Sequence, residues 1–250
     1  MARGVTLLTG KDVYARLPIR THLITERDDL TEVVAYYTAG LAGPGDIAVL
    51  SESMVAIAQG RAVVYSEVRP GILARFLCRF PQKHGSLATP QAMQLAVNEA
   101  GHGRIILGAI AAGLGRILGR RGWFFCVAGR ELAYIDDIAG TLPPYDRYIV
   151  MGPKDPSGLA SAIKARIGAD AIVADVNDIQ KVDIIGYSGD LKALDMEAVE
   201  QALRDNPAGN DDQQTPIVVL KRLVLEPSPA PGKEGSADLT PGPLYGRLVR

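Results

Sequence analysis

Short apolar runs alternate with helical patterns throughout residues 147–225, and this alternation constrains the fold more than any other feature of the chain. The predicted strands are RYIVMG at 147–152, AIVAD at 171–175, KVDIIGYS at 181–188 and PIVVLKRLVL at 216–225. Between them, residues 155–168 predict a helix, because Asp155 suits the cap and Pro156 suits the first turn. A second helix is predicted at 195–204. Alternating elements of this kind predict a mixed α/β or α+β fold.

The first half of the chain predicts fewer strands and one long helical stretch. Its predicted strands are THLIT at 21–25, IAVL at 47–50 and WFFCVAG at 123–129. Asp28 and Asp29 precede a helical pattern at 30–41, and acidic residues favour a helix N-terminus. The segment 54–61 is also expected to be helical. Apolar residues spaced three and four apart predict helices through most of 70–121, which we interpret as a helical insert.

The most apolar segment, IILGAIAAGLGRIL at 105–118, is too short to cross a membrane. A bilayer span needs about 20 apolar residues, and Arg116 interrupts this run. We interpret the segment as a buried helix whose small residues permit close packing. The alternative is a helix that lies on a membrane or a partner, with basic residues such as Arg120 and Arg121 facing phosphate head groups.

Charge and cysteine content exclude several classes of protein. The 27 Lys and Arg against 28 Asp and Glu give a net charge of −1, which argues against a general nucleic-acid binder. Cys78 and Cys126 lack CxxC spacing, so a disulfide scaffold and a zinc ribbon are excluded. The first 20 residues contain no apolar run of the signal-peptide type. We therefore expect a soluble, cytoplasmic protein.

The final 25 residues differ in composition from the rest of the chain. Residues 226–250 contain five prolines and four glycines and few apolar side chains. Such a segment buries too little apolar surface to offset the entropy of ordering it. We therefore predict one globular domain at 1–225 followed by a flexible tail at 226–250.

Acidic residues gather at three places that follow apolar runs or lie in turns. These clusters are Asp136–Asp137, Asp175–Asn177–Asp178 and Asn210–Asp211–Asp212. Carboxylates at strand ends readily converge on one crevice of an α/β sheet, and Mg²⁺ or Mn²⁺ prefers their hard oxygen atoms. Asp175 is the best placed, because it ends a five-residue apolar strand. The structural alternative is that these residues form Asx-turns and helix caps.

Several segments, taken in order, resemble the coenzyme F420-0:L-glutamate ligase family. The resemblance rests on RDDLTEVV at 27–34, GDIAVLSESMVAIAQGR at 45–61, VAGRELAYIDDIAG at 127–140, AIVADVNDIQKVDIIG at 171–186 and NPAGNDDQQTPIVVLK at 206–221. It implies a mixed α/β fold, an intertwined homodimer, and a nucleotide with divalent cations held between lobes. It also implies that GTP or ATP activates the carboxylate of a small-molecule substrate as an acyl phosphate, which an amine then attacks to form an amide.

The resemblance assigns roles to residues at matching positions. It implies that Asp175 and either Asp136 or Asp137 hold Mg²⁺ or Mn²⁺, and that Asp212 or Gln213 completes the set. The residues that it implies for nucleotide binding are Ser51, Ser53, Arg61 and Asn177.

The chain also departs from the family pattern in its phosphate-binding loop. Where the family has lysines, residues 51–59 read SESMVAIAQ, with Ala56 and Ile57 at the centre. The loss of lysines removes positive charge that would neutralise phosphate. This departure, together with the apolar segment 105–118, leaves a second hypothesis open: a non-catalytic binding or scaffold protein that retains the ligase fold.

Overall fold

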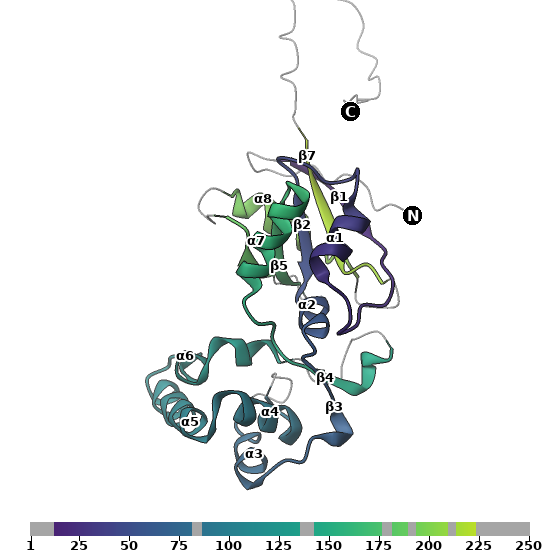
Figure 1. Cartoon of the computed structure of the whole chain (residues 1–250). Helices are drawn as coiled ribbons and strands as arrows, with labels where there is room; N and C mark the ends of the chain where they lie inside the picture. Colours follow the sequence, from purple (N-terminus) through teal and green to yellow (C-terminus); the bar gives the residue numbers. More distant parts are fainter. Residues whose placement is uncertain are drawn as a thin grey trace, which may run out of the picture.

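A five-stranded mixed sheet organises the larger of two lobes (Figure 1). The computed structural model of the chain describes residues 13–81, 87–135, 143–176, 182–189, 194–209 and 214–223. The strands are β1 (Val13–Ile19), β2 (Ile47–Ser51), β5 (Asp170–Val176), β6 (Val182–Tyr187) and β7 (Ile217–Leu223). They lie in the order β1-β7-β2-β5-β6, with β2 and β5 parallel and the other neighbours antiparallel. This arrangement confirms the predicted mixed fold.

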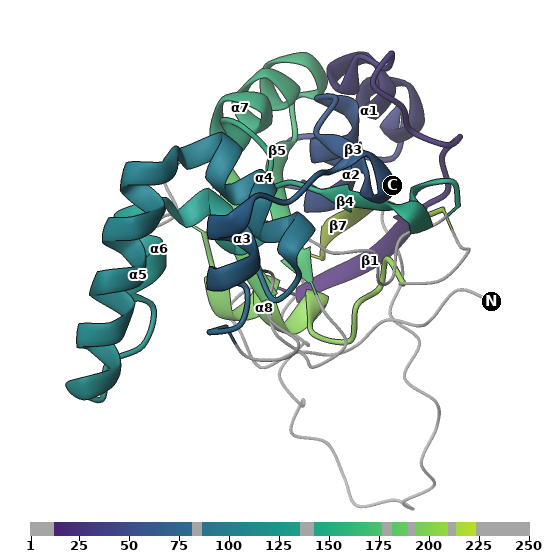
Figure 2. The same cartoon turned by 90° about the horizontal axis from the view of Figure 1, so that it is seen from below.

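Helices cover both faces of this sheet (Figure 2). One face is covered by α1 (Leu30–Thr38) and α7 (Pro156–Ile167), and the other by α8 (Met196–Leu203). Successive residues of a strand point to opposite faces, so Val173 of β5 belongs to the α1–α7 core and Ile172 to the α8 core. β5 and β7 are therefore apolar on both faces, as their near-continuous apolar sequences require.

A second, helical lobe is inserted between β2 and β5. Its elements are α3 (Ile72–Leu77), α4 (Pro90–Ala100), α5 (His102–Ile117), α6 (Trp123–Ala128) and the 3-10 helix η2 (Arg130–Tyr134). Its connection to the sheet consists of α2 (Glu52–Ala58), β3 (Ala62–Val64), η1 (Tyr65–Glu67), η3 (Tyr145–Arg147) and β4 (Tyr148–Val150). β3 and β4 pair antiparallel. The helical lobe is thus connected at the edge of the sheet where β2 ends, and it lies below that edge in the view of Figure 1.

Local capping signals correctly predicted two helices of the sheet lobe, α1 and α7. Asp155 caps α7 through Gly158 N–H, Pro156 begins the helix, and Gly168 ends it with a φ of 75°. Asp29 caps α1 by accepting bonds from the N–H groups of the first turn. These signals act within a few residues of themselves, which explains why they can be read without the tertiary structure.

The predicted strand at 21–25 is wrong. The segment has no regular secondary structure, and the edge strand of the sheet is β1, which lies upstream and pairs with β7. Asp28 explains the difference, because its carboxylate accepts the backbone N–H and the hydroxyl of Thr25 and contacts the ring of His22. These bonds hold the chain in a turn at a place where its composition favours a strand.

The predicted strand at 123–129 is also wrong, because Trp123–Ala128 form helix α6. Gly122 and Gly129 flank the helix with φ angles of 87° and 132°, which few other residues adopt. Aromatic residues favour strands only when a neighbouring strand accepts them. Here the neighbour is α5, against which α6 packs, so tertiary packing overrides the local preference.

The interpretation of 105–118 as a buried helix is wrong as well. The segment is helical, but only Ile105, Gly108 and Gly115 of α5 are buried. The helix lies at the outer edge of its lobe, so it packs on one side only (Figure 2). None of the helices in the described part of the chain has the length and apolarity that a bilayer crossing requires. The tail proposed at 226–250 lies outside the described residues.

A close contact between β6 and α7 gives a stability prediction. A Cβ atom placed on Gly186 would lie 2.5 Å from the backbone carbon of Pro156. We expect Gly186→Ala to lower the free energy of unfolding by about 1–3 kcal/mol in urea denaturation, because backbone cannot move aside as a side chain does. Gly113→Ala is the control, since nothing lies near its added Cβ and it should stabilise α5 by about 1 kcal/mol. Equal effects of the two substitutions would contradict the packing.

The central position of β7 gives a second prediction. Ile217, Val218, Val219 and Leu220 are all buried, and fully burying such a side chain contributes about 1.5–3 kcal/mol. Truncation after Thr215 removes β7 from between β1 and β2, and we expect insoluble or unfolded protein. Truncation after Glu226 is the matched control, with an expected change in melting temperature of a few degrees. A large loss in the control would show that the segment beyond Glu226 is part of the folded domain.

Candidate functional site

The candidate site lies at the edge of the sheet where the parallel strands β2 and β5 end. Ser51 closes β2 opposite Ala174, and Asp175 follows as the next residue of β5. Ligands of open α/β sheets bind outside the carboxyl ends of such strands. The helical lobe is connected at this same edge (Figure 1), so the strand ends face the region between the two lobes.

Two aspartates face each other directly at this edge. Asp175 of β5 and Asp183 of β6 are cross-strand partners, so their side chains leave the sheet on the same face. An irregularity in the register at Val173–Ala174 separates this pair from the rest of the ladder, and such bulges re-aim the side chains beyond them. Like charges directly opposite each other destabilise a sheet. A cation bound between the two carboxylates would offset their mutual repulsion.

Tyr134 reaches this acidic pair from the helical lobe. Its hydroxyl donates to Oδ2 of Asp183 over 3.4 Å. Partial burial raises the pKa of Tyr134 to about 12, together with the negative charges of Asp183, Glu52 and Asp175. The tyrosine thus remains a protonated donor throughout the physiological range. Glu52, the first residue of α2, is itself buried and adds a third carboxylate to this region.

Arg61 joins helix α4 to the loop before α7, against which the segment with Tyr134 packs. Its Nε donates to the carbonyl of Gly152 over 2.6 Å, and its Nη2 to Oε1 of Glu99 over 3.2 Å. A Cβ on Gly152 would lie 2.6 Å from the carbonyl of Glu131 and 3.0 Å from Cβ of Tyr134. Because Gly152 has no side chain, η2 packs directly against the loop that leads into α7. Arg61, predicted to bind nucleotide, is buried and bonded within the protein at this point.

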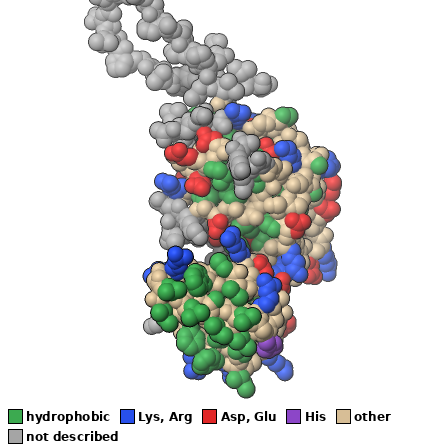
Figure 3. Space-filling view, turned by 90° about the vertical axis from the view of Figure 1, so that its left-hand side faces the viewer, with side chains coloured by type: hydrophobic (Ala, Val, Ile, Leu, Met, Phe, Trp, Pro, Cys, Tyr) green, Lys and Arg blue, Asp and Glu red, His purple; other side chains and the backbone are tan. Residues whose placement is uncertain are grey.

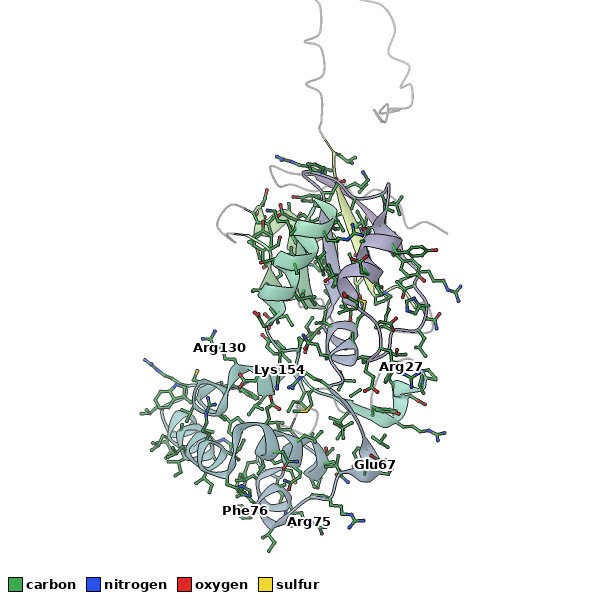
Figure 4. All side chains as sticks on the ribbon, in the orientation of Figure 1. Arg27, Glu67, Arg75, Phe76, Arg130 and Lys154 are labelled. Carbon is green, nitrogen blue, oxygen red and sulfur yellow. The ribbon has the colours of Figure 1, made fainter. Side chains whose placement is uncertain are left out.

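Two basic side chains are exposed where the lobes meet (Figure 4). Lys154 belongs to the loop before α7, and Arg130 begins η2. The side chain of Gln59 clamps the backbone of Lys154, accepting its N–H over 2.7 Å and donating to its carbonyl over 2.8 Å. Nζ of Lys154 lies 3.8 Å from Oε1 of Glu99, and the side chain remains 69% exposed. Both cations have room to contact an anionic ligand.

The loop of the predicted phosphate site serves mainly as packing. Ser51 ends β2, and its N–H donates to the carbonyl of Pro216. Ser53 lies in α2 and is half-buried. Ala56 and Ile57, at the centre of the loop in which the family pattern has lysines, are buried against Val150 of β4. These apolar residues form the contact between α2 and the connection to the helical lobe, where an unpaired lysine would be costly.

The remaining predicted ligands lie outside the described residues. These are Asp136, Asp137, Asn177 and Asp212, together with Gln213. Within the described part of the chain, no three His, Cys, Asp or Glu side chains form a group that holds a metal ion by itself. The carboxylates of Asp175 and Asp183 nevertheless fit Mg²⁺ chemically, since this ion commonly takes one or two protein carboxylates and completes its shell with water and phosphate oxygens.

Sequence reasoning identified Asp175 but missed the residues that surround it. Asp183 lies inside an apolar run, where it looks like the outward-facing residue of an alternating strand. Glu52 and Tyr134 lie in segments quoted for the family resemblance but carry no motif of their own. A usable signal was Lys154 in GPKDP, a basic residue directly before a helix start. These residues come together only in the folded protein, because β5 pairs with β6 and η2 contacts β6 through Tyr134.

Comparison with known proteins identifies the family. The family model described as F420-0:Gamma-glutamyl ligase matches residues 18–176, which is more than half of the 250-residue chain. The chain belongs to this family. No curated protein matches it. The match to the F420-0:gamma-glutamyl ligase family spans Glu52, Tyr134, Lys154 and Asp175, whereas Asp183 lies beyond its end. Membership confirms the resemblance and makes ligase chemistry the first hypothesis for the site.

The raised pKa of Tyr134 predicts a specific loss of stability in alkaline solution. Tyrosine has an ordinary pKa of 10.0, so folding favours the protonated form, and this contribution is complete below pH 10. It is lost as the pH rises towards about 12. We expect the free energy of unfolding of Tyr134→Phe to fall less steeply than that of the wild type across this interval, measured by urea denaturation. Tyr36→Phe, at an exposed position of α1, controls for loss of a tyrosine, and parallel curves for all three proteins would contradict the prediction.

Proposed function

We propose that the protein is a nucleotide- and metal-dependent ligase that forms an amide on a small-molecule carboxylate, with glutamate or another amino acid as the amine. Membership of the F420-0:gamma-glutamyl ligase family supports the class of reaction. The observation that carries the proposal is the Asp175–Asp183 pair at the strand ends, with Glu52 and Tyr134 beside it. Asp175 and Asp183 would hold Mg²⁺ or Mn²⁺, which would neutralise the phosphates of GTP or ATP.

The chemistry needs positive charge on the phosphates as well as carboxylates. The substrate carboxylate attacks the terminal phosphorus and releases the nucleoside diphosphate, and the amine nitrogen then attacks the acyl carbon and releases phosphate. Charge develops on phosphate oxygens in the first step, so preorganised cations accelerate it. Lys154 and Arg130 occupy suitable positions between the lobes (Figure 4). In this proposal they replace the lysines whose positions Ala56 and Ile57 fill.

Nucleotide binding by the purified full-length protein tests the proposal. We expect calorimetry to detect ATP or GTP binding only when Mg²⁺ or Mn²⁺ is present. Asp175→Asn should weaken this binding by about tenfold or more, because it removes an anionic ligand. Glu200→Gln on the exposed side of α8 is the matched control and should leave nucleotide binding unchanged.

A second substitution tests the role of the cation before α7. We expect Lys154→Gln to weaken nucleotide binding while leaving Mn²⁺ binding in the absence of nucleotide unchanged. Lys164→Gln, near the other end of α7, is the control, because that lysine pairs with Asp170. Phosphate release in the presence of nucleotide, metal and a panel of amino acids would then report turnover directly.

The second candidate function is a binding or scaffold protein that retains the ligase fold. The burial of Ala56 and Ile57 favours it, because the residues that replace the lysines have acquired a packing role. No nucleotide binding under any divalent condition would support the scaffold and contradict the ligase. Turnover that Asp175→Asn abolishes would exclude the scaffold.

A further inference from the structure

Helix α5 packs on α6 through glycines, and this leaves its large apolar residues outside. A Cβ on Gly108 would lie 3.0 Å from Cβ of Ala128, and one on Gly115 would lie 3.1 Å from Cγ of Trp123. The two glycines are seven residues apart, so they share one face of the helix. With so narrow an inner face, the bulky side chains of α5 point away from the protein.

The outer face of α5 is a continuous apolar surface. Its residues recur at spacings of three and four and are 45–83% exposed: Ile106, Leu107, Ile110, Leu114 and Ile117. Figure 3 views the molecule from this side and shows the hydrophobic side chains gathered over the helical lobe. Exposed apolar residues scattered singly need no explanation, but a gathered surface of this kind marks an interaction site. We call these five residues the α5 face.

Helix α3 and the turn that follows it extend this surface towards the C-terminal end of α5. Phe76 and Phe80 are 55% and 53% exposed and stack edge to face, with ring centroids 5.3 Å apart. Nη2 of Arg116 on α5 donates to the carbonyl of Phe80 over 3.3 Å, which ties α5 to the turn that follows α3. Apolar residues from two elements therefore contribute to one region of the lobe.

The charge around the α5 face has a single sign. Residues 68–134 hold nine of the chain's 27 Lys and Arg but only two of its 28 Asp and Glu, which are Glu99 and Glu131. Glu99 is paired with Arg61 on the side of the lobe that faces the sheet. On α5, Arg104 and Arg116 flank the apolar face, and Arg120 and Arg121 follow its end, all of them exposed. The net charge of the chain is near zero because the basic charge of the helical lobe is balanced by the acidic charge of the rest of the chain.

We propose that the α5 face is a membrane-binding surface that docks on the interface of an anionic lipid bilayer. An amphipathic helix with an apolar face and flanking arginines lies in the plane of the interface, burying its apolar side among acyl chains while its cations meet phosphate head groups. Each basic residue near an anionic leaflet adds to this attraction. A second copy of the chain fits less well. In an isologous contact the arginines around the α5 face of one copy would lie close to the same arginines of the other.

Vesicle binding by the purified full-length protein tests this proposal. We expect the protein to float with phosphatidylcholine vesicles that contain phosphatidylglycerol and not with vesicles of phosphatidylcholine alone. Added salt should weaken binding, because it screens exposed charges. The fluorescence of Trp123, the only tryptophan of the chain, should shift to shorter wavelength on binding, since α6 lies directly beneath α5.

Paired substitutions separate the apolar and charged contributions. Leu107→Ser with Ile110→Ser, and separately Arg120→Gln with Arg121→Gln, should each reduce partitioning by about tenfold or more. The matched controls lie on the sheet lobe: Tyr36→Ser at an exposed apolar position, and Arg20→Gln with Arg27→Gln at exposed basic ones. Both controls should bind vesicles as the wild type does. All these sites are exposed, so unchanged thermal melting confirms that each variant is folded.

Several outcomes would overturn the proposal. Equal binding to neutral and anionic vesicles, or equal binding by the α5 variants and the controls, would remove the role assigned to these residues. Absence of vesicle binding would do so as well. If sedimentation equilibrium instead showed a dimer that Leu107→Ser with Ile110→Ser converts to monomer, the α5 face would be an interface between copies. Nucleotide binding is measured without lipid, so failure here leaves the proposed ligase function intact.

Discussion

The parallel pairing of β2 with β5 is the constraint on which the rest of the structure depends. Parallel strands must be joined by a crossover, and in this chain the crossover contains the entire helical lobe as well as α7. The pairing places Ser51 and Asp175 at one edge and connects the lobe at that same edge. Site and lobe are thus consequences of one topological choice. A different partner for β2 would separate the acidic residues from Tyr134.

At the junction between the lobes, apolar residues of α2 pack in the loop where the family pattern has lysines. Ala56 and Ile57 fill a small core with Val150, and buried Arg61 binds the carbonyl of Gly152 nearby. An apolar junction fixes the position of the helical lobe, while exposed Lys154 and Arg130 supply cations at its surface. Packing and charge are therefore carried by different residues. The proposed ligase requires both, because a phosphate site works only when its donors are held in place.

The two lobes also divide the charge of the molecule, which gives them different roles in our proposals. The sheet lobe carries the carboxylates of the candidate site, and the helical lobe carries the arginines and the α5 face. An acidic site facing a basic lobe favours a ligand that combines metal ions with phosphates. The outer face of the basic lobe points away from this site (Figure 1), so docking there leaves the region between the lobes open.

The sequence alone determined the features that local chemistry controls: the caps of α1 and α7, the strands β5 to β7, the family, and Asp175 as a strand-end carboxylate. The tertiary structure decided what depends on neighbours far along the chain. It made 123–128 a helix because α5 accepts it, and it exposed α5 because glycines form its inner face. It also brought Tyr134 to Asp183 across 49 positions of sequence, and strand pairing set Asp183 opposite Asp175. Capping acts over one helical turn and leaves a local pattern, whereas strand pairing and lobe docking act across the fold and leave none.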